Sequence, residues 1–154
     1  MKIGLNSNPT KRFKYGIEFM NKSYKNKQFD ENKKYDRFEL NLDYRFSNKL
    51  SANFSTQRDR TLDDIGYLMT EGENIYFGIR DQKSIENSID IDYRIDTKKS
   101  INLNFRNFWS IADYDEVLFK LRDDGYREIS DYSLIESDPN TNFNICNLYV
   151  KFEF

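Results

Sequence analysis

The chain is dominated by segments in which apolar and polar side chains alternate at successive positions. In the segment 38–46, large apolar side chains occupy every even position, and every side chain between them is polar or charged. Side chains of a β-strand point alternately to the two faces of its sheet, so a period of two predicts strands with one apolar and one polar face. The same alternation recurs in six more segments, at 3–5, 13–19, 50–55, 85–95, 101–109 and 148–154.

The connections between these segments alternate between short and long. Tight polar turns are expected at 8–11, 47–49 and 96–99, and long polar stretches lie near 22–34, 60–83 and 112–141. Within the third long stretch, an alternating segment leads into Asp123-Asp124-Gly125, which predicts a small additional hairpin there. An antiparallel up-and-down meander with all short turns on one rim and all long loops on the other is the layout of a transmembrane β-barrel.

Composition excludes several classes of function. The 24 Lys and Arg residues against 26 Asp and Glu residues give a net charge of −2, which argues against a protein that binds nucleic acid or an anionic membrane through its overall charge. The chain has no His and one Cys, Cys146, so His-dependent catalysis, His-ligated zinc and an intrachain disulfide are excluded. With 13 Phe and 11 Tyr residues the chain is too aromatic to be disordered. We expect no enzymatic activity, no catalytic residue, no metal and no cofactor.

Two all-β architectures remain open. Segments 35–46 and 85–95 match the ~9–11 residues that a tilted strand needs to cross a bilayer, and aromatic residues such as Tyr44 and Trp109 lie near strand ends, as membrane interfaces require. The alternative is a soluble β-sandwich that buries the apolar face as its core and binds carbohydrate. Its sugar-stacking candidates are loop tyrosines, namely Tyr67, Tyr76, Tyr126 and Tyr132.

The barrel interpretation, of about seven membrane strands, assigns a role to each face. The charged face is too polar for lipid and is expected to line a wet lumen. Its members are Glu39, Asp43, Arg45, Glu86, Asp90, Asp92, Arg94, Arg106, Lys151 and Glu153. The residues expected to face lipid are Phe38, Leu40, Leu42, Ile89, Ile91, Leu103, Phe105, Val150, Phe152 and Phe154. Cys146 lies two positions before Leu148 and therefore belongs with the apolar set.

Three short acidic segments are weak candidates for a catalytic or cation-binding site. Asp63-Asp64 and Asp123-Asp124 could be read as a glycosidase acid and base, and Asp138-Pro139-Asn140 as a cation loop. Acids next to each other in polar loops are usually turn formers, and the third segment lacks calcium-loop spacing. We therefore assign these residues to turns.

The second half of the chain resembles a known family over roughly residues 75–154. The matching residues are Arg80-Asp81-Gln82, the strand 85–95, Arg106-Asn107-Phe108-Trp109, Tyr114, Phe119, Leu121, Asp123-Asp124-Gly125, Asn142-Phe143-Asn144 and Asn147. They resemble the outer-membrane β-barrel domain of unknown function that ends large Gram-negative proteins opening with a family-9-like carbohydrate-binding domain. The family usually has His where Asn107 stands, and it continues past Phe154 through an Ala-Pro-Gly-Ser turn.

This resemblance implies location and partners. It implies the outer membrane of a Gram-negative bacterium, lipid as a partner, and a wall, pore or anchor for an exported protein that handles carbohydrate. Bacterial single-chain barrels have an even number of strands with both ends periplasmic, whereas seven strands are an odd number. The expectation is therefore that residues 1–154 are the C-terminal part of a larger barrel, that N-terminal strands are missing, and that these residues alone form no stable closed pore.

Overall fold

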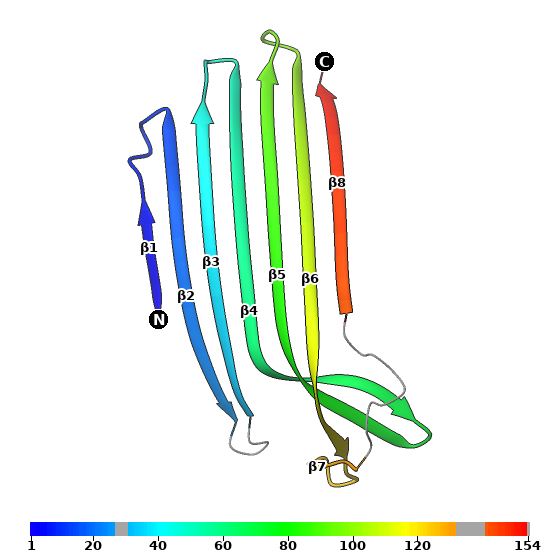
Figure 1. The fold of residues 1–154 in the computed structure, drawn as a ribbon. Coiled ribbons are helices and arrows are strands. Elements are labelled where there is room, and N and C mark those ends of the chain that lie inside the picture. The colour runs from blue at the N-terminus through cyan, green and yellow to red at the C-terminus, as the bar shows by residue number, and fades with distance from the viewer. Residues whose placement is uncertain (27–30, 132–140, 154) are drawn as a thin grey trace.

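The computed structural model is a single antiparallel sheet in which the strands follow one another in chain order (Figure 1). The structure describes residues 1–26, 31–131 and 141–153. The strands are β1 (Lys2–Asn6), β2 (Phe13–Asn26), β3 (Glu31–Arg45), β4 (Leu50–Glu71), β5 (Asn74–Arg94), β6 (Ser100–Leu121), β7 (Arg127–Ile129) and β8 (Thr141–Glu153). The predicted all-β antiparallel meander is confirmed.

The sheet is open at both edges. Over the described residues, β1 pairs only with β2, and β8 pairs only with β6. The short strand β7 pairs with the far end of β6, so β6 has β7 beside its end and β8 along the rest of its length. No helix that is long and apolar enough to cross a membrane occurs in the described ranges.

The strand register sorts the side chains onto two chemically different faces. Residues directly opposite each other in an antiparallel pair lie on the same face. One such row contains only apolar or aromatic residues, namely Tyr15, Leu42, Phe54, Ile89, Phe105 and Leu148. The row one position along contains Lys14, Asp43, Asn53, Asp90, Asn104 and Tyr149. We call the face with the first row the apolar face and the opposite face the polar face.

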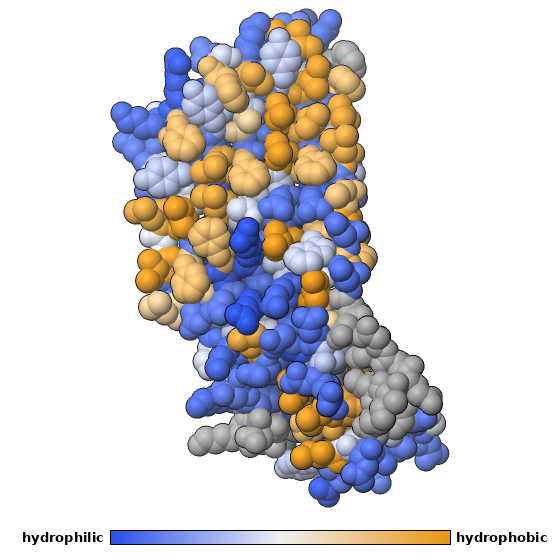
Figure 2. Space-filling model, in the orientation of Figure 1, coloured by the Kyte–Doolittle hydropathy of each residue, from blue (hydrophilic) through white to orange (hydrophobic). Residues whose placement is uncertain are grey.

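No second layer of the described structure covers the apolar face. Leu148 is 62% exposed and Phe152 is 58% exposed, while the buried hydrophobic residues in the described ranges are only Tyr76, Ala112 and Leu118. Figure 2 shows the apolar side chains gathered over the upper part of the sheet. The described residues therefore form one sheet with an exposed apolar surface, and the two packed sheets of a sandwich are not both present among them.

The expectation of long loops near 22–34, 60–83 and 112–141 is wrong for much of their length. The strands β4 and β5 continue through 60–83 and are joined by a tight turn at Gly72-Glu73, and β6 runs on to Leu121. In 60–83, polar residues such as Asp63 and Asp64 and consecutive apolar residues at 67–69 and 75–77 interrupt the strict alternation, so the sequence gives no clear strand signal there. The small hairpin around Asp123-Asp124-Gly125 does form, between the end of β6 and β7.

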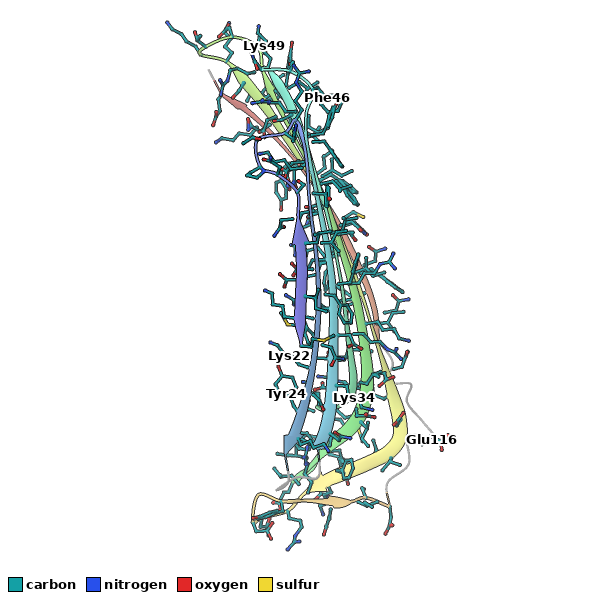
Figure 3. The ribbon with its side chains drawn as sticks, turned by 90° about the vertical axis from the view of Figure 1, so that its left-hand side faces the viewer. Lys22, Tyr24, Lys34, Phe46, Lys49 and Glu116 are labelled. Carbon is teal, nitrogen blue, oxygen red and sulfur yellow. The ribbon has the colours of Figure 1, made fainter. Side chains whose placement is uncertain are left out.

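The ends of the strands opposite the three short turns bend toward the polar face. Viewed edge-on, β6 curves to the side on which Lys22 and Tyr24 lie, away from the side of Lys34 and Phe46 (Figure 3). The β4–β5 pairing shifts register between Thr61 and Asp64, with Asp63 in the left-handed region at φ 56°, as in a β-bulge that bends its strand. The bend brings β7 to β3, where Arg127 and Glu31 form an ion pair of 2.8 Å.

Gly72 provides a test of the tight β4–β5 turn. Its φ of 58° is left-handed, and a Cβ added there meets no atom within 4 Å, so Gly72→Ala is strained only through its backbone. We expect the free energy of unfolding to fall by about 1 kcal/mol in urea titration. Gly4→Ala is the matched control, because its added Cβ would lie 3.6 Å from the Ile17 carbonyl oxygen, an ordinary contact. Equal effects of the two substitutions would contradict this account of the turn.

Candidate functional site

The register places the two sequence-predicted sets of residues on opposite faces. The polar face carries Glu39, Asp43, Arg45, Glu86, Asp90, Asp92, Arg94, Arg106, Lys151 and Glu153. The apolar face carries Phe38, Leu40, Leu42, Ile89, Ile91, Leu103, Phe105, Val150 and Phe152. Phe154 lies outside the described residues. Facing a lumen or facing lipid stays a prediction for both sets.

Many polar-face side chains are joined in pairs across neighbouring strands. Arg106 donates two hydrogen bonds to the carboxylate of Glu86, of 2.7 and 2.8 Å. Asn102 donates to Asp92 at 2.6 Å, and Asn53 donates to Asp43 at 2.9 Å. Cross-strand pairs of this kind stabilise a sheet, and here they also neutralise or satisfy acidic groups of the predicted set.

A network of charged side chains crosses four strands where the sheet bends. Lys33 of β3 donates to Asp64 of β4 at 2.6 Å, and Arg80 of β5 donates to the other oxygen of the same carboxylate at 2.9 Å. Arg80 also donates to the hydroxyl of Tyr114 of β6 at 2.9 Å, and its guanidinium lies 5.7 Å from that ring's centroid. Asp64 is only 8% exposed, so a buried carboxylate connects the network.

The local sequence explains how this network forms. The register shift after Thr61 changes the alternation of β4, and Asp64 consequently stands opposite Arg80 on the polar face. A Cβ on Gly66 would lie 2.4 Å from the guanidinium carbon of Arg80, so only glycine leaves room for that side chain. The bulge and the glycine together seat the guanidinium beside the carboxylate.

The two cations keep Asp64 ionised. Burial alone would raise the pKa of the Asp64 carboxyl, but the hydrogen bonds from Lys33 and Arg80 outweigh burial and hold its pKa below the ordinary value. The Asp64 carboxylate therefore serves as the acceptor that joins both cations and connects β3, β4 and β5. In the part of the chain that the structure describes, no cluster of three or more His, Cys, Asp or Glu side chains could hold a metal ion.

A second cluster lies beside the first on the polar face. The carboxylate of Asp59 accepts hydrogen bonds from the Tyr35 hydroxyl at 2.6 Å, from Arg37 Nε at 2.7 Å and from the Gln57 amide at 2.6 Å. Tyr35 and Arg37 belong to β3, and Gln57 belongs to β4, the strand of Asp59 itself. The two clusters form a dense band of hydrogen-bonding groups between the straight part of the sheet and its bend.

The sequence carries no clear signal for this band of hydrogen-bonding groups, and the assignment of Asp64 to a turn is wrong. Asp64 lies inside β4, and only the bulge at Asp63, which alternation does not reveal, turns it to the polar face. Asp123 and Asp124 do lie in a turn, where the Tyr126 N–H donates to Asp124 at 3.1 Å. Tyr67 is exposed and Tyr76 is buried. Tyr132 and Asp138-Pro139-Asn140 lie outside the described residues.

The one cysteine lies on the face that the alternation along its strand predicts. Cys146 is opposite Asn107 on the apolar face, and its thiol is free and exposed. It can therefore serve as a reference position, or be replaced by Ser, in labelling experiments.

Comparison with known proteins identifies a family. A family model described as a domain of unknown function, DUF5916, matches residues 1–154. The match includes the first half of the chain as well as residues 75–154. No curated protein and no solved structure matches the chain.

Asp64→Asn tests the charged network. Loss of the carboxylate charge leaves Lys33 and Arg80 without their anion, and we expect the free energy of unfolding to fall by about 1–3 kcal/mol. The pKa of Asp64 is lower in the folded than in the unfolded protein, so its contribution is present above about pH 4 and is lost as pH falls through the folded value. The stability of Asp64→Asn should accordingly depend less on acid pH than that of the wild type, measured by denaturant titration at several pH values.

Asp63→Asn is the control for this comparison. Asp63 is exposed, and Asn tolerates its left-handed φ, so the bulge should persist with little change in stability. If Asp63→Asn matched Asp64→Asn in stability loss and in pH dependence, the network would not be the source of either effect.

Proposed function

The chain belongs to the DUF5916 family, and we propose that it forms part of the wall of an outer-membrane β-barrel in a Gram-negative bacterium. In this proposal the apolar face contacts lipid and the polar face lines an aqueous lumen. The segment itself is non-enzymatic, and it serves as a wall, pore or anchor for an exported protein that handles carbohydrate.

The exposed apolar face is the single observation that supports this proposal most strongly. Its apolar side chains extend across every long strand from β1 to β8, and no described element packs on them. In water such a surface would be unfavourable by roughly 25 cal/mol for each Å² of apolar area. Lipid removes that cost without a second protein layer.

We call the apolar part of this face, near the three short turns, the apolar band. On β2 and β3 the band reaches Phe19 and Phe38, which are paired. On β4, β5, β6 and β8 its continuous part ends two rows nearer the short turns, at Phe54, Ile89, Phe105 and Leu148, although Ile85 and Trp109 lie farther along the same face.

Aromatic side chains gather at the end of the band near the short turns. Phe13 and Tyr44 are paired across β2 and β3, with ring centroids 6.3 Å apart, and Tyr44 contacts Phe46 edge-on at 4.6 Å. Aromatic girdles mark the interfaces of membrane barrels, and short turns lie on the periplasmic side. The bent end, with its charged network, then lies at the cell surface.

Barrel closure needs partners for the two free edges. Unpaired backbone groups of β1 and β8 would each cost several kcal/mol in lipid. We infer that further strands pair with these edges in the assembled barrel, and that a carbohydrate-binding domain accompanies them. Hydrogen-bonding groups on the polar face would let small polar solutes, sugars among them, pass or be held.

Labelling at adjacent positions of β3 and of β5 tests which face of the sheet contacts lipid. In a Cys146→Ser background, Leu42→Cys and Ile91→Cys should react with an apolar, lipid-dissolved thiol reagent in outer-membrane preparations. Asp43→Cys and Asp90→Cys, one position along, should react instead with a small water-soluble reagent. Protection of Leu42→Cys and Ile91→Cys from both reagents would contradict the proposal and favour the core of a soluble β-sandwich that binds carbohydrate.

A charge placed on either face gives an independent test. Leu42→Arg should destabilise the folded protein in lipid by about 2–4 kcal/mol and reduce membrane assembly, because the arginine would lie in the hydrocarbon region. Asp43→Arg, on the polar face, should assemble nearly normally. Assembly is measured by protease resistance of the membrane fraction, and equal loss in both variants would count against a lipid-facing Leu42.

A further inference from the structure

We propose that a basic cluster on the apolar face binds the phosphate groups of anionic lipids in the outer leaflet. The cluster consists of Lys34, Arg58, Arg60 and Lys83. This inference rests on the proposed membrane location, and it adds a specific lipid class to it.

The register places the cluster directly beyond the apolar band. Arg58 stands between Phe38 and Ile85 in one row, and Arg60 stands opposite Lys83 in the next. Lys34 points to the same side of the sheet as Phe46, and in Figure 2 hydrophilic side chains adjoin the lower edge of the apolar band. A lipid whose chains lay on the band would bring its headgroup to these cations.

Three of the four cations of the cluster lack an anionic partner within the described protein. Among the described residues, Lys34, Arg58 and Arg60 make no ion pair and no side-chain hydrogen bond, whereas Lys83 forms an ion pair of 4.0 Å with Asp113. Asp36 stands opposite Arg60, but its carboxylate accepts a hydrogen bond from Asn21 and forms no ion pair with the arginine.

Three arginines of the polar face differ in this respect. Arg37, Arg80 and Arg106 on the polar face each contact a carboxylate at 2.7–2.9 Å. On the apolar face, by contrast, Arg60 lies directly opposite another cation, Lys83, which is destabilising without an anion between them. A phosphate bound from outside the protein would relieve this repulsion, and arginine binds phosphate through two parallel hydrogen bonds.

The position of the cluster favours lipid over dissolved phosphate. Phe38 and Ile85 flank Arg58, so an anion there would sit beside an apolar surface that can take acyl chains. Amphipathic ligands satisfy both surfaces at once, whereas inorganic phosphate would satisfy only the charges.

Spin-labelled lipids measure this selectivity in the assembled protein, purified from outer membranes together with the strands that complete its sheet and reconstituted into phosphatidylcholine vesicles. Wild-type protein should immobilise spin-labelled phosphatidylglycerol in preference to spin-labelled phosphatidylcholine. Arg58→Gln with Arg60→Gln should lower the relative association constant for phosphatidylglycerol by roughly fivefold per arginine, the effect expected of one cation near an anionic surface. Lys14→Gln with Lys22→Gln, an equal charge change on the polar face, should leave the selectivity intact.

The outcomes separate the inference from the proposed function. Immobilised lipid without headgroup selectivity, or selectivity that survives in Arg58→Gln with Arg60→Gln, would overturn the lipid site while leaving the membrane location standing. Loss of selectivity on adding inorganic phosphate at constant ionic strength would also overturn it, in favour of a dissolved anion. Absence of any immobilised lipid would overturn the proposed function and this inference together.

Discussion

The in-register backbone pairing of the strands is the constraint on which the rest of the structure depends. Each strand alternates apolar and polar side chains, but a sheet has two chemically distinct faces only if neighbouring strands alternate in phase. A slip of one residue in any strand would move its apolar set to the polar face. The register keeps Leu42, Phe54 and Ile89 in one row and Asp43, Asn53 and Asp90 in the next.

The two faces can be predicted from the sequence because alternation is local information. The side to which Leu42 or Ile91 points follows from its neighbours within one strand, and the pairing then joins strands of matching phase. Strand ends were harder to locate, since β4 and β5 continue through 60–83 with polar residues on both faces. The role of Asp64 cannot be predicted from the sequence. The bulge at Asp63 sets the face to which Asp64 points, and the space above Gly66 allows Arg80 to lie beside it.

The two ends of the sheet differ in how they are stabilised. Along the straight part, burial contributes little within the described structure, and backbone pairing with cross-strand polar contacts holds the strands together. At the bend, Asp64 and Leu118 are buried, and charge-assisted hydrogen bonds connect β3 to β6. An apolar solvent around the straight part would supply the stabilisation that a hydrophobic core provides elsewhere.

The claim that lipid covers the apolar face can be tested on the unmodified chain through its one tryptophan. Trp109 lies on this face, in the row of Arg58 and Ile85, and its indole N–H donates to Asn142 at 2.8 Å. In vesicles containing lipids brominated at different depths, its fluorescence should be quenched most strongly by bromine near the headgroup and least by bromine at the bilayer centre. Equal fluorescence with all brominated lipids, together with quenching by aqueous iodide, would contradict the account.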